Sequence, residues 1–333
     1  MIKAGFASSA PDWHWWRQFP KGQTSWGNVE FRFAGDLSEC DLLFVYDAIP
    51  KHLCGKISAK KAVFIASEPE NVKKYRTDFL SQFDLVLTTD ESTTHENKTI
   101  CQVALPWLAG AWDEQGKLLP RPMAFDDFES LYPVKKKLVS VVSSNKAFTP
   151  EHRLRLEFVD KLKQYFGNEI DYFGRNINSF GDKTEVLSEY RYHISLENCY
   201  IKNYWTEKLS DAYLTLTYPI YYGCPNINDF FSKDQLTAID ISDERAAIEI
   251  IKKTINSDIC EKNASDLVSA RRSVMNEYNI FAVLSRIAND LDSKNLPGPL
   301  TRLNAEDFYK RHRTHLSRSL AQGKRAIQRA IGL

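Results

Sequence analysis

Short apolar segments alternate with polar segments that contain glycine, proline, aspartate and serine over the first ninety or so residues. The apolar segments are rich in β-favouring residues, and each is bounded by turn-forming residues. The expected strands cover residues 2–8, 29–33, 42–46, 62–66 and 85–88. This rhythm is typical of an open, mainly parallel sheet with crossover connections.

The second half of the chain repeats this alternation after a change of character. Residues 118–137 combine prolines, an acidic patch and a basic run, which predicts a linker between domains. A continuous apolar strand is expected at 138–144 and another at 170–173. Between them Leu154, Phe158 and Leu162 share one face of a predicted helix.

The stretch 190–231 is predicted as strand, polar loop, helix and strand. Tyr192, Ile194 and Leu196 alternate with polar residues, as in a half-buried strand. Thr206 is a candidate helix N-cap, and Pro219 is expected to end the helix before an extended segment at 220–222. The apolar face of this helix is expected to contain Leu209, Ala212, Tyr213 and Leu216.

Helical patterns dominate the remainder, after an expected strand at 237–241 and a helix at 246–255. The acidic triplet Asp290-Leu291-Asp292 falls in an amphipathic helical pattern, so we interpret it as a solvated face. From residue 310 the tail is basic, with Leu316, Leu320, Ile327 and Ile331 on one helical face. This pattern favours a membrane-surface helix over a terminal helix that packs on a domain or crosses back between domains.

The composition of the chain limits the classes of function that are consistent with its sequence. The chain has 333 residues, 43% of them hydrophobic, and a net charge of +1, so overall charge gives no argument for nucleic-acid binding. Six scattered cysteines without CxxC pairs indicate reduced thiols. The seven histidines form no zinc pattern, and Asp126-Asp127 is not spaced as D-x-D. No apolar run is long enough to span a bilayer, and the chain begins almost directly with a strand. We therefore expect a cytoplasmic protein, with the tail as a peripheral contact to the inner membrane.

The candidate binding residues cluster where the helix after Thr206 is expected to begin. Tyr204, Glu207 and Lys208 cluster where backbone N–H groups and the helix dipole favour an anion. A lysine in the first turn opposes the dipole unless a negative group lies beside it, and a phosphate is such a group. From spacing alone, a solvated Glu207–Lys208 pair on a surface helix is equally consistent.

The residues of this stretch resemble the donor-binding signature of the family 10 fucosyltransferases, the α-1,3/1,4 enzymes that use GDP-fucose. The family pattern is F-E-N-S, then Y-V-T-E-K, then a proline, a glycine and a downstream phenylalanine. Three positions depart from it: Leu196, Cys199 and Trp205. The positions that match it are Glu197, Asn198, Tyr204, Thr206, Glu207, Lys208, Ala212, Pro219, Gly223 and Phe231.

Two further segments carry the resemblance. Family members have a strand followed by the proposed catalytic base, which here indicates Glu68, with Glu70 as the competing carboxylate. An S-S-N loop and an arginine-bearing helix then indicate Arg155 rather than Arg153 as the diphosphate ligand. Arg175 of the F-G-R strand tip is a weaker donor-binding candidate, because it also fits a surface arginine after a glycine turn.

The resemblance implies an α/β fold of GT-B type, with two Rossmann-like domains facing each other across a cleft. We expect an acceptor-binding domain at 1–125, a nucleotide-sugar-binding domain at 138–300 and a basic tail at 301–333. The implied reaction is inverting transfer of L-fucose from GDP-β-L-fucose to a glycan hydroxyl of a cell-surface polysaccharide or lipopolysaccharide. No metal or other cofactor is obligatory, since cationic side chains and the helix start stabilise the leaving GDP.

Each candidate residue has an expected role in that reaction. Glu68 accepts the acceptor proton, and Glu207 faces the sugar where positive charge develops. Arg155, Lys208 and Arg175 hold the diphosphate, while Asn198 and Tyr204 position the donor.

Two alternatives stay open: a GT-B transferase for another nucleotide sugar, suggested by Cys199 and Trp205, and a non-catalytic glycan-binding protein. The aromatic run Trp13-His14-Trp15-Trp16 suits either an acceptor platform or a half-buried hydrophobic cluster.

Overall fold

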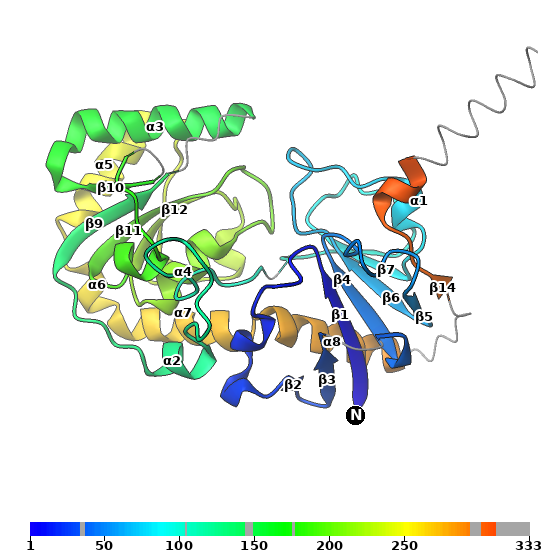
Figure 1. Cartoon of the computed structure of the whole chain (residues 1–333). Coiled ribbons are helices and arrows are strands. Elements are labelled where there is room, and N and C mark those ends of the chain that lie inside the picture. Colours follow the sequence, from blue (N-terminus) through cyan, green and yellow to red (C-terminus); the bar gives the residue numbers. More distant parts are fainter. Residues whose placement is uncertain (34–36, 104, 144–148, 175–176, 294–300, 311–333) are drawn as a thin grey trace, which may run out of the picture.

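The computed structural model describes residues 1–333 except 34–36, 104, 144–148, 175–176, 294–300 and 311–333. Two parallel sheets flanked by helices form two lobes that face each other (Figure 1). The predicted GT-B architecture is therefore confirmed by the sheet order itself. In the described residues the N-terminal sheet has the order β2-β3-β1-β4-β6-β7-β8 and the C-terminal sheet the order β10-β9-β11-β12-β13.

The strands of the N-terminal sheet agree closely with the apolar segments of the sequence. They are β1 (Ile2–Ser8), β2 (Ser25–Trp26), β3 (Val29–Arg32), β4 (Leu42–Tyr46), β6 (Ala62–Ile65), β7 (Leu85–Thr88) and β8 (Lys98–Ile100). All pairings except β2 with β3 are parallel. The central strands β4 and β6 are buried along their whole length, as expected for strands covered on both faces.

The C-terminal sheet is entirely parallel in the described residues. Its strands are β9 (Lys137–Val142), β10 (Asp171–Phe173), β11 (Tyr190–Leu196), β12 (Tyr218–Tyr222) and β13 (Thr237–Ala238). The helices of the chain are α1 (Thr77–Leu80), α2 (Phe125–Ser130), α3 (Pro150–Phe166), α4 (Glu207–Leu214), α5 (Glu244–Ile255), α6 (Ile259–Lys262), α7 (Ala264–Asn276) and α8 (Ile280–Ser293). Within the described residues, the short 3-10 turns are η1 (Trp15–Gln18), η2 (Pro20–Gly22), η3 (Leu37–Glu39), η4 (Gly167–Glu169), η5 (Lys183–Val186) and η6 (Ile227–Asp229).

Two local expectations were wrong. Helix α4 ends at Leu214 rather than before Pro219, and Leu216 has a left-handed φ of 51° outside the helix. The Thr215 hydroxyl donates to the Asp211 carbonyl (2.9 Å), and the Thr217 N–H donates to the Ala212 carbonyl (2.8 Å), so these groups satisfy the helix end early. The expected linker at 118–137 contains α2, whose Phe125 and Phe128 are buried in the C-terminal core.

Helix α8 connects the two lobes. It follows α7, which packs on α4, and it then crosses to β1 and β2 of the N-terminal sheet (Figure 1). Phe281 of α8 stacks on Phe19 with ring centroids 4.1 Å apart, and Leu284 lies in the same core. The expected domain limits stay a prediction, but the core contacts of α8 are with the N-terminal sheet.

The beginning of the expected tail also lies on the N-terminal lobe. Strand β14 (Thr301–Arg302) pairs antiparallel with β5 (Ser58–Ala59), and Leu303 is fully buried. The amphipathic segment that predicted membrane contact falls on 311–333, outside the described residues. Within the described part of the chain, no helix is both long and apolar enough to cross a membrane.

Candidate active site

The start of α4 carries a buried network built on Glu197, the residue that follows β11. This carboxylate is fully buried and accepts hydrogen bonds from the Thr206 N–H (2.7 Å) and hydroxyl (2.9 Å). Lys208 Nζ lies 3.2 Å from Glu197 Oε2 and 3.0 Å from Thr206 Oγ1. Gly223 leaves the necessary room, because a Cβ there would lie 2.4 Å from Glu197 Cγ. Thr206 is the N-cap, as predicted.

Charges alternate along this network. Lys208 Nζ is 3.2 Å from Glu207 Oε1, and Lys183 Nζ of η5 is 3.7 Å from the same oxygen. Lys183 Nζ also lies 2.9 Å from Asp211 Oδ2. The order is therefore Glu197, Lys208, Glu207, Lys183, Asp211, in which each lysine lies between two carboxylates. The alternative of a solvated Glu207–Lys208 surface pair does not describe this arrangement.

The network sets the protonation states of its members. Burial alone would raise the pKa of Glu207, but Lys208 and Lys183 outweigh burial and lower this pKa to about 2. Burial would lower the pKa of Lys208, but Glu197 and Glu207 raise it above its ordinary value. Burial raises the pKa of Glu197 in spite of Lys208. At neutral pH, Glu207 is thus a permanent anion and Lys208 a permanent cation.

A cavity of about 240 Å³ opens above this network. Its wall includes residues from the ends of β9 and β11, from α3, from η5 and from α4. They are Val142, Arg155, Lys183, Leu187, His193, Ser195, Leu196, Asn198, Glu207, Lys208 and Asp211. Three cationic side chains therefore border one enclosed space, which suits a ligand with more than one negative charge.

Arg155 and Asn198 lie in this wall, where the sequence predicted donor-binding residues. The Arg155 guanidinium donates a hydrogen bond to the Asn198 side-chain oxygen. Burial lowers the pKa of Arg155, and Glu197 partly offsets the effect. The rejected candidate Arg153 is exposed and does not line the cavity. Arg175 lies outside the described residues.

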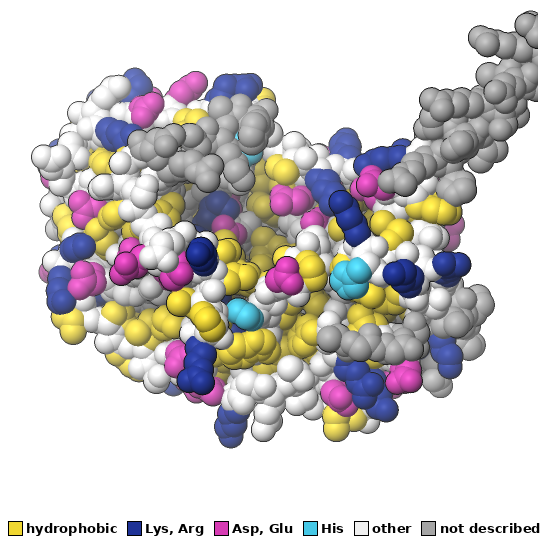
Figure 2. All heavy atoms as spheres, in the orientation of Figure 1, with side chains coloured by type: hydrophobic (Ala, Val, Ile, Leu, Met, Phe, Trp, Pro, Cys, Tyr) yellow, Lys and Arg dark blue, Asp and Glu magenta, His cyan; other side chains and the backbone are white. Residues whose placement is uncertain are grey.

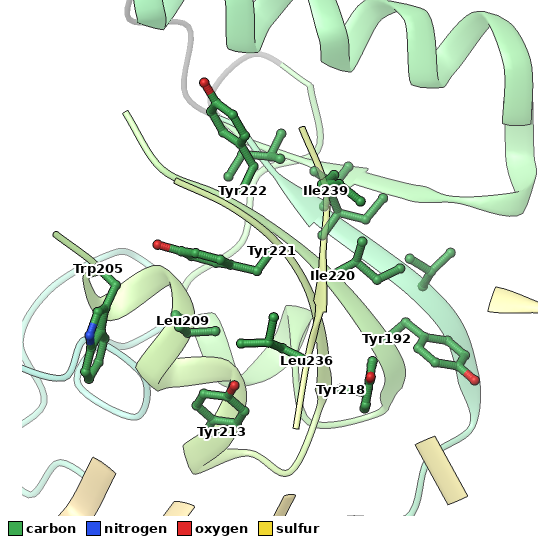
Figure 3. Close-up of a cluster of buried hydrophobic side chains, with 14 of the residues drawn as sticks. Tyr192, Trp205, Leu209, Tyr213, Tyr218, Ile220, Tyr221, Tyr222, Leu236 and Ile239 are labelled. Carbon is green, nitrogen blue, oxygen red and sulfur yellow. The ribbon is translucent and has the colours of Figure 1, made fainter. Parts of the chain in front are cut away.

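Tyr204 and two departures from the family pattern, Cys199 and Trp205, are buried beside the cavity, whereas the third departure, Leu196, lines it. Tyr204 is buried and is not among the cavity-lining residues. Trp205 packs with Phe231 (5.2 Å between ring centroids) and Tyr278 (5.4 Å). Figure 3 shows Trp205 beside α4, among the buried hydrophobic side chains of this lobe. Cys199 is buried as well. The Trp205 side chain is therefore a core packing residue and does not contact the cavity.

Glu68 approaches the network from the N-terminal lobe. It follows β6, and its side chain is exposed. The surrounding residues still displace enough water to raise its pKa. Asp47 raises the pKa further, Lys208 and Lys73 lower it, and Glu207 raises it. Lys208 and Glu207 belong to the opposite lobe, so Glu68 faces the cleft. Figure 2 shows a hollow between the lobes, with acidic and basic side chains along it.

The remaining candidates lie elsewhere. Glu70 is exposed and accepts a hydrogen bond from the Ser92 hydroxyl (3.0 Å) on the N-terminal lobe. In the aromatic run, Trp15 is buried in the N-terminal core, while Trp13 and Trp16 border a small apolar hollow of about 110 Å³. Among the described residues, no group of three histidines, cysteines or carboxylates is placed to hold a metal ion.

Sequence reasoning missed Lys183 and the role of Asp211. The segment Asp182 to Glu185 has the form of a capping box, and Asp182 caps η5 as that pattern predicts. Asp182 also accepts the N–H groups of Gly110 (2.8 Å) and Ala111 (2.8 Å) from the interdomain connection. The capping box could have located η5, but no local pattern places Lys183 beside α4.

Comparisons with known proteins identify one part of the chain. Residues 132–252 match the family described as Glycosyltransferase family 10 (fucosyltransferase), C-terminal part. An α-(1,3)-fucosyltransferase, FucT, of Helicobacter pylori is 33% identical over 126 residues, which are 36% of this chain and 25% of that protein. The matched region thus spans about a quarter of this curated relative.

Solved structures give a weaker likeness. A crystal structure of an α1,3-fucosyltransferase with GDP-fucose aligns with 81% of this chain and 82% of its own, at 20% identity and a TM-score of 0.44. Anabaena HepE in complex with UDP-glucose aligns with 88% of this chain and all of its own, at 10% identity and a TM-score of 0.43.

Proposed function

We propose that this protein, whose residues 132–252 match glycosyltransferase family 10, is an inverting fucosyltransferase that uses GDP-β-L-fucose. One observation carries the proposal. Glu68, a carboxylate of the N-terminal lobe, is close enough to Lys208 and Glu207 for their charges to shift its pKa, and these two residues border a cavity that Arg155 and Lys183 also line. A diphosphate and a deprotonating base are the two things that this transfer needs on opposite sides of the sugar.

In the proposed mechanism the acceptor hydroxyl attacks C1 of the fucosyl group from the side of Glu68. The C1–O bond to the β-phosphate breaks, its electron pair leaves with GDP, and the hydroxyl proton passes to Glu68. Burial and the neighbouring Asp47 raise the pKa of Glu68, which makes it a stronger base than an ordinary carboxylate. Attack opposite to the leaving group converts the β-linked donor into an α-fucoside.

The C-terminal lobe stabilises the leaving group and the positive sugar. Arg155 and Lys208, which line the cavity, compensate the charge that develops on GDP, and the positive end of the α4 dipole adds to their effect. Glu207, held anionic by two lysines, lies where it can stabilise positive charge at C1. Asn198, which accepts from Arg155, orients that guanidinium toward the donor. Tyr204 acts from the core, by supporting the loop before α4.

The acceptor that we propose is a hydroxyl of a cell-surface polysaccharide or lipopolysaccharide sugar. Turnover against a panel of such glycans, followed by linkage determination, identifies it. Transfer to none of them, with donor hydrolysis retained, would exclude this acceptor class.

Donor identity is tested by thermal shift with GDP, UDP, TDP and CMP. The proposal predicts the largest stabilisation by GDP, since a ligand that binds only the folded state raises the melting temperature more the more tightly it binds at a given concentration. A larger shift with another nucleotide contradicts the fucose donor. The core position of Trp205 removes one reason for favouring a different nucleotide sugar.

A further inference from the structure

A second carboxylate, Asp47, lies beside the turn that carries Glu68. It directly follows β4, and its φ of 66° is the left-handed conformation that residues other than glycine seldom adopt. The Asp47 N–H donates to the Ile65 carbonyl at the end of β6 (2.9 Å). This hydrogen bond therefore fixes the Asp47 backbone to Ile65, which lies three residues before Glu68.

The Asp47 carboxylate is held by two side chains from the loop after β6. The Tyr75 hydroxyl donates to Asp47 Oδ1 (2.5 Å), and Lys73 Nζ donates to the same oxygen (2.9 Å). Lys73 Nζ also donates to the Asp47 carbonyl (3.2 Å) and lies 4.4 Å from the centre of the Tyr75 ring. All three side chains are half-buried, so the arrangement is more than a surface ion pair.

These contacts hold both ends of the segment that carries Glu68. The Asp47 N–H bonds the Ile65 carbonyl, three residues before Glu68, and the Asp47 carboxylate bonds Lys73 and Tyr75, five and seven residues after it. The segment between them thus starts and ends on one residue at the end of β4, which fixes the position from which the Glu68 side chain extends.

We propose that Asp47, together with Lys73 and Tyr75, is a positioning residue that holds both ends of the segment carrying Glu68 and places a negative charge beside it. The role of Glu68 as base rests on the proposed function, but its titration does not. The effect on rate follows if Glu68 is the base, because a carboxylate of higher pKa accepts the acceptor proton more readily.

Charged groups of both lobes shift the pKa of Glu68. Asp47 and Lys73 lie on its own lobe, and Lys208 and Glu207 lie across the cleft. After burial, Asp47 is the largest contribution that raises the pKa of Glu68, whereas Lys73 lowers it. Removing the charge of Asp47 therefore lowers the titration midpoint of Glu68, and removing the charge of Lys73 raises it. A purely structural role of the ion pair would not produce shifts of opposite sign.

The test is a carboxyl ¹³C NMR titration of protein labelled in its glutamates, with the Glu68 signal identified by its loss in Glu68→Gln. We expect Asp47→Asn to move the midpoint down and Lys73→Met to move it up, each by about 0.5 pH unit or more. Asp41→Asn is the matched control, because Asp41 precedes the same strand β4 and its carboxylate accepts the Lys3 N–H. The control should leave the midpoint in place.

Equal midpoints in Asp47→Asn, Lys73→Met and the control would overturn the proposal, as would shifts of the same sign. Far-UV circular dichroism and melting temperature identify a variant that fails to fold, and Lys73→Met then decides alone. The titration needs no substrate, so its failure is separate from a failure to transfer fucose.

A kinetic readout tests the positioning role. Tyr75→Phe removes the connecting hydroxyl and keeps the ring. We expect kcat to fall about tenfold with an unchanged KM for the donor, because the diphosphate is held by the other lobe. A change in KM alone, or no change in kcat, would contradict positioning of Glu68 by Tyr75.

Discussion

The two walls of the cleft shift the pKa of a glutamate side chain in opposite directions. On the N-terminal wall, the side chain of Glu68 is exposed, and its pKa is raised by partial burial and then by the Asp47 carboxylate. On the C-terminal wall, Glu207 lies between Lys208 and Lys183, and its pKa is lowered to about 2. Carboxylates whose pKa values are pushed apart can divide the work of proton acceptance and charge stabilisation. The difference teaches that the neighbours of each glutamate, rather than its residue type, assign its role.

The largest expected effect is loss of the base. Glu68→Gln should lower transfer by ~10² or more, because an amide cannot accept the acceptor proton. GDP binding should survive, since the cationic cavity lies on the other lobe. Single-turnover transfer and calorimetric GDP binding measure the two effects. Glu70→Gln, two residues away and exposed, is the matched control, and unchanged turnover of Glu68→Gln removes Glu68 from this role.

Loss of a cation on the opposite wall should act on binding instead. Lys208→Ala should weaken GDP binding by roughly tenfold to a hundredfold, as expected for a lost charge-assisted hydrogen bond. The variant also leaves Glu197 and Glu207 without their shared cation, so its melting temperature should fall. Lys202→Ala, in the exposed loop before α4, is the control. GDP affinity equal to that of the wild type, in folded Lys208→Ala, would place the diphosphate elsewhere.

A smaller effect is expected from Lys183, which touches Glu207 and Asp211. Lys183→Met should raise the pKa of Glu207 and lower kcat about tenfold, because Glu207 loses one of the two ion pairs that hold its carboxylate in place. Lys161→Met, which removes an exposed ion pair with Glu244, serves as the control. A kcat unaffected by Lys183→Met would show that Lys208 alone keeps Glu207 in position.

The smallest expected effect concerns stability against pH. The pKa of Glu207 is lowered on folding, so its contribution is complete above the ordinary pKa near 4.5 and is lost as pH falls toward 2. The stability advantage of the wild type over Glu207→Gln should therefore shrink by about 1–2 kcal/mol between pH 6 and pH 3. Urea unfolding at each pH measures this, with Glu157→Gln, exposed on α3, as the control. A constant difference across this range contradicts the lowered pKa.

The sequence predicted the elements whose signals are local. Strands β1, β4 and β7 have the expected limits, because short apolar runs between turn residues define them. The N-cap at Thr206 and the resemblance around Glu197 also located the start of α4. The end of α4 was not predictable in the same way, since it depends on how Thr215 and Thr217 bond back to the helix.

The missing parts of the site depend on contacts between distant residues. Lys183 and Asp211 are 28 residues apart in the sequence, and so are Asp47 and Tyr75, yet the side chains of each pair are hydrogen-bonded. No periodicity or motif encodes such pairs, because they form only when separate strands end at the same edge. Likewise, the polar and apolar pattern of α8 predicts a helix but does not say which lobe covers its apolar face.

The stereochemistry of the product tests the account most directly. GDP-β-L-fucose, enzyme and a glycan acceptor are followed by ¹H NMR, which reports the anomeric configuration of the first product and the release of GDP. Direct attack assisted by Glu68, opposite a GDP held by the cations of the other lobe, predicts an α-fucoside formed in step with GDP. A β-fucoside as the first product would contradict the account. So would the absence of GDP release from this mixture when a parallel mixture with another nucleotide sugar is turned over.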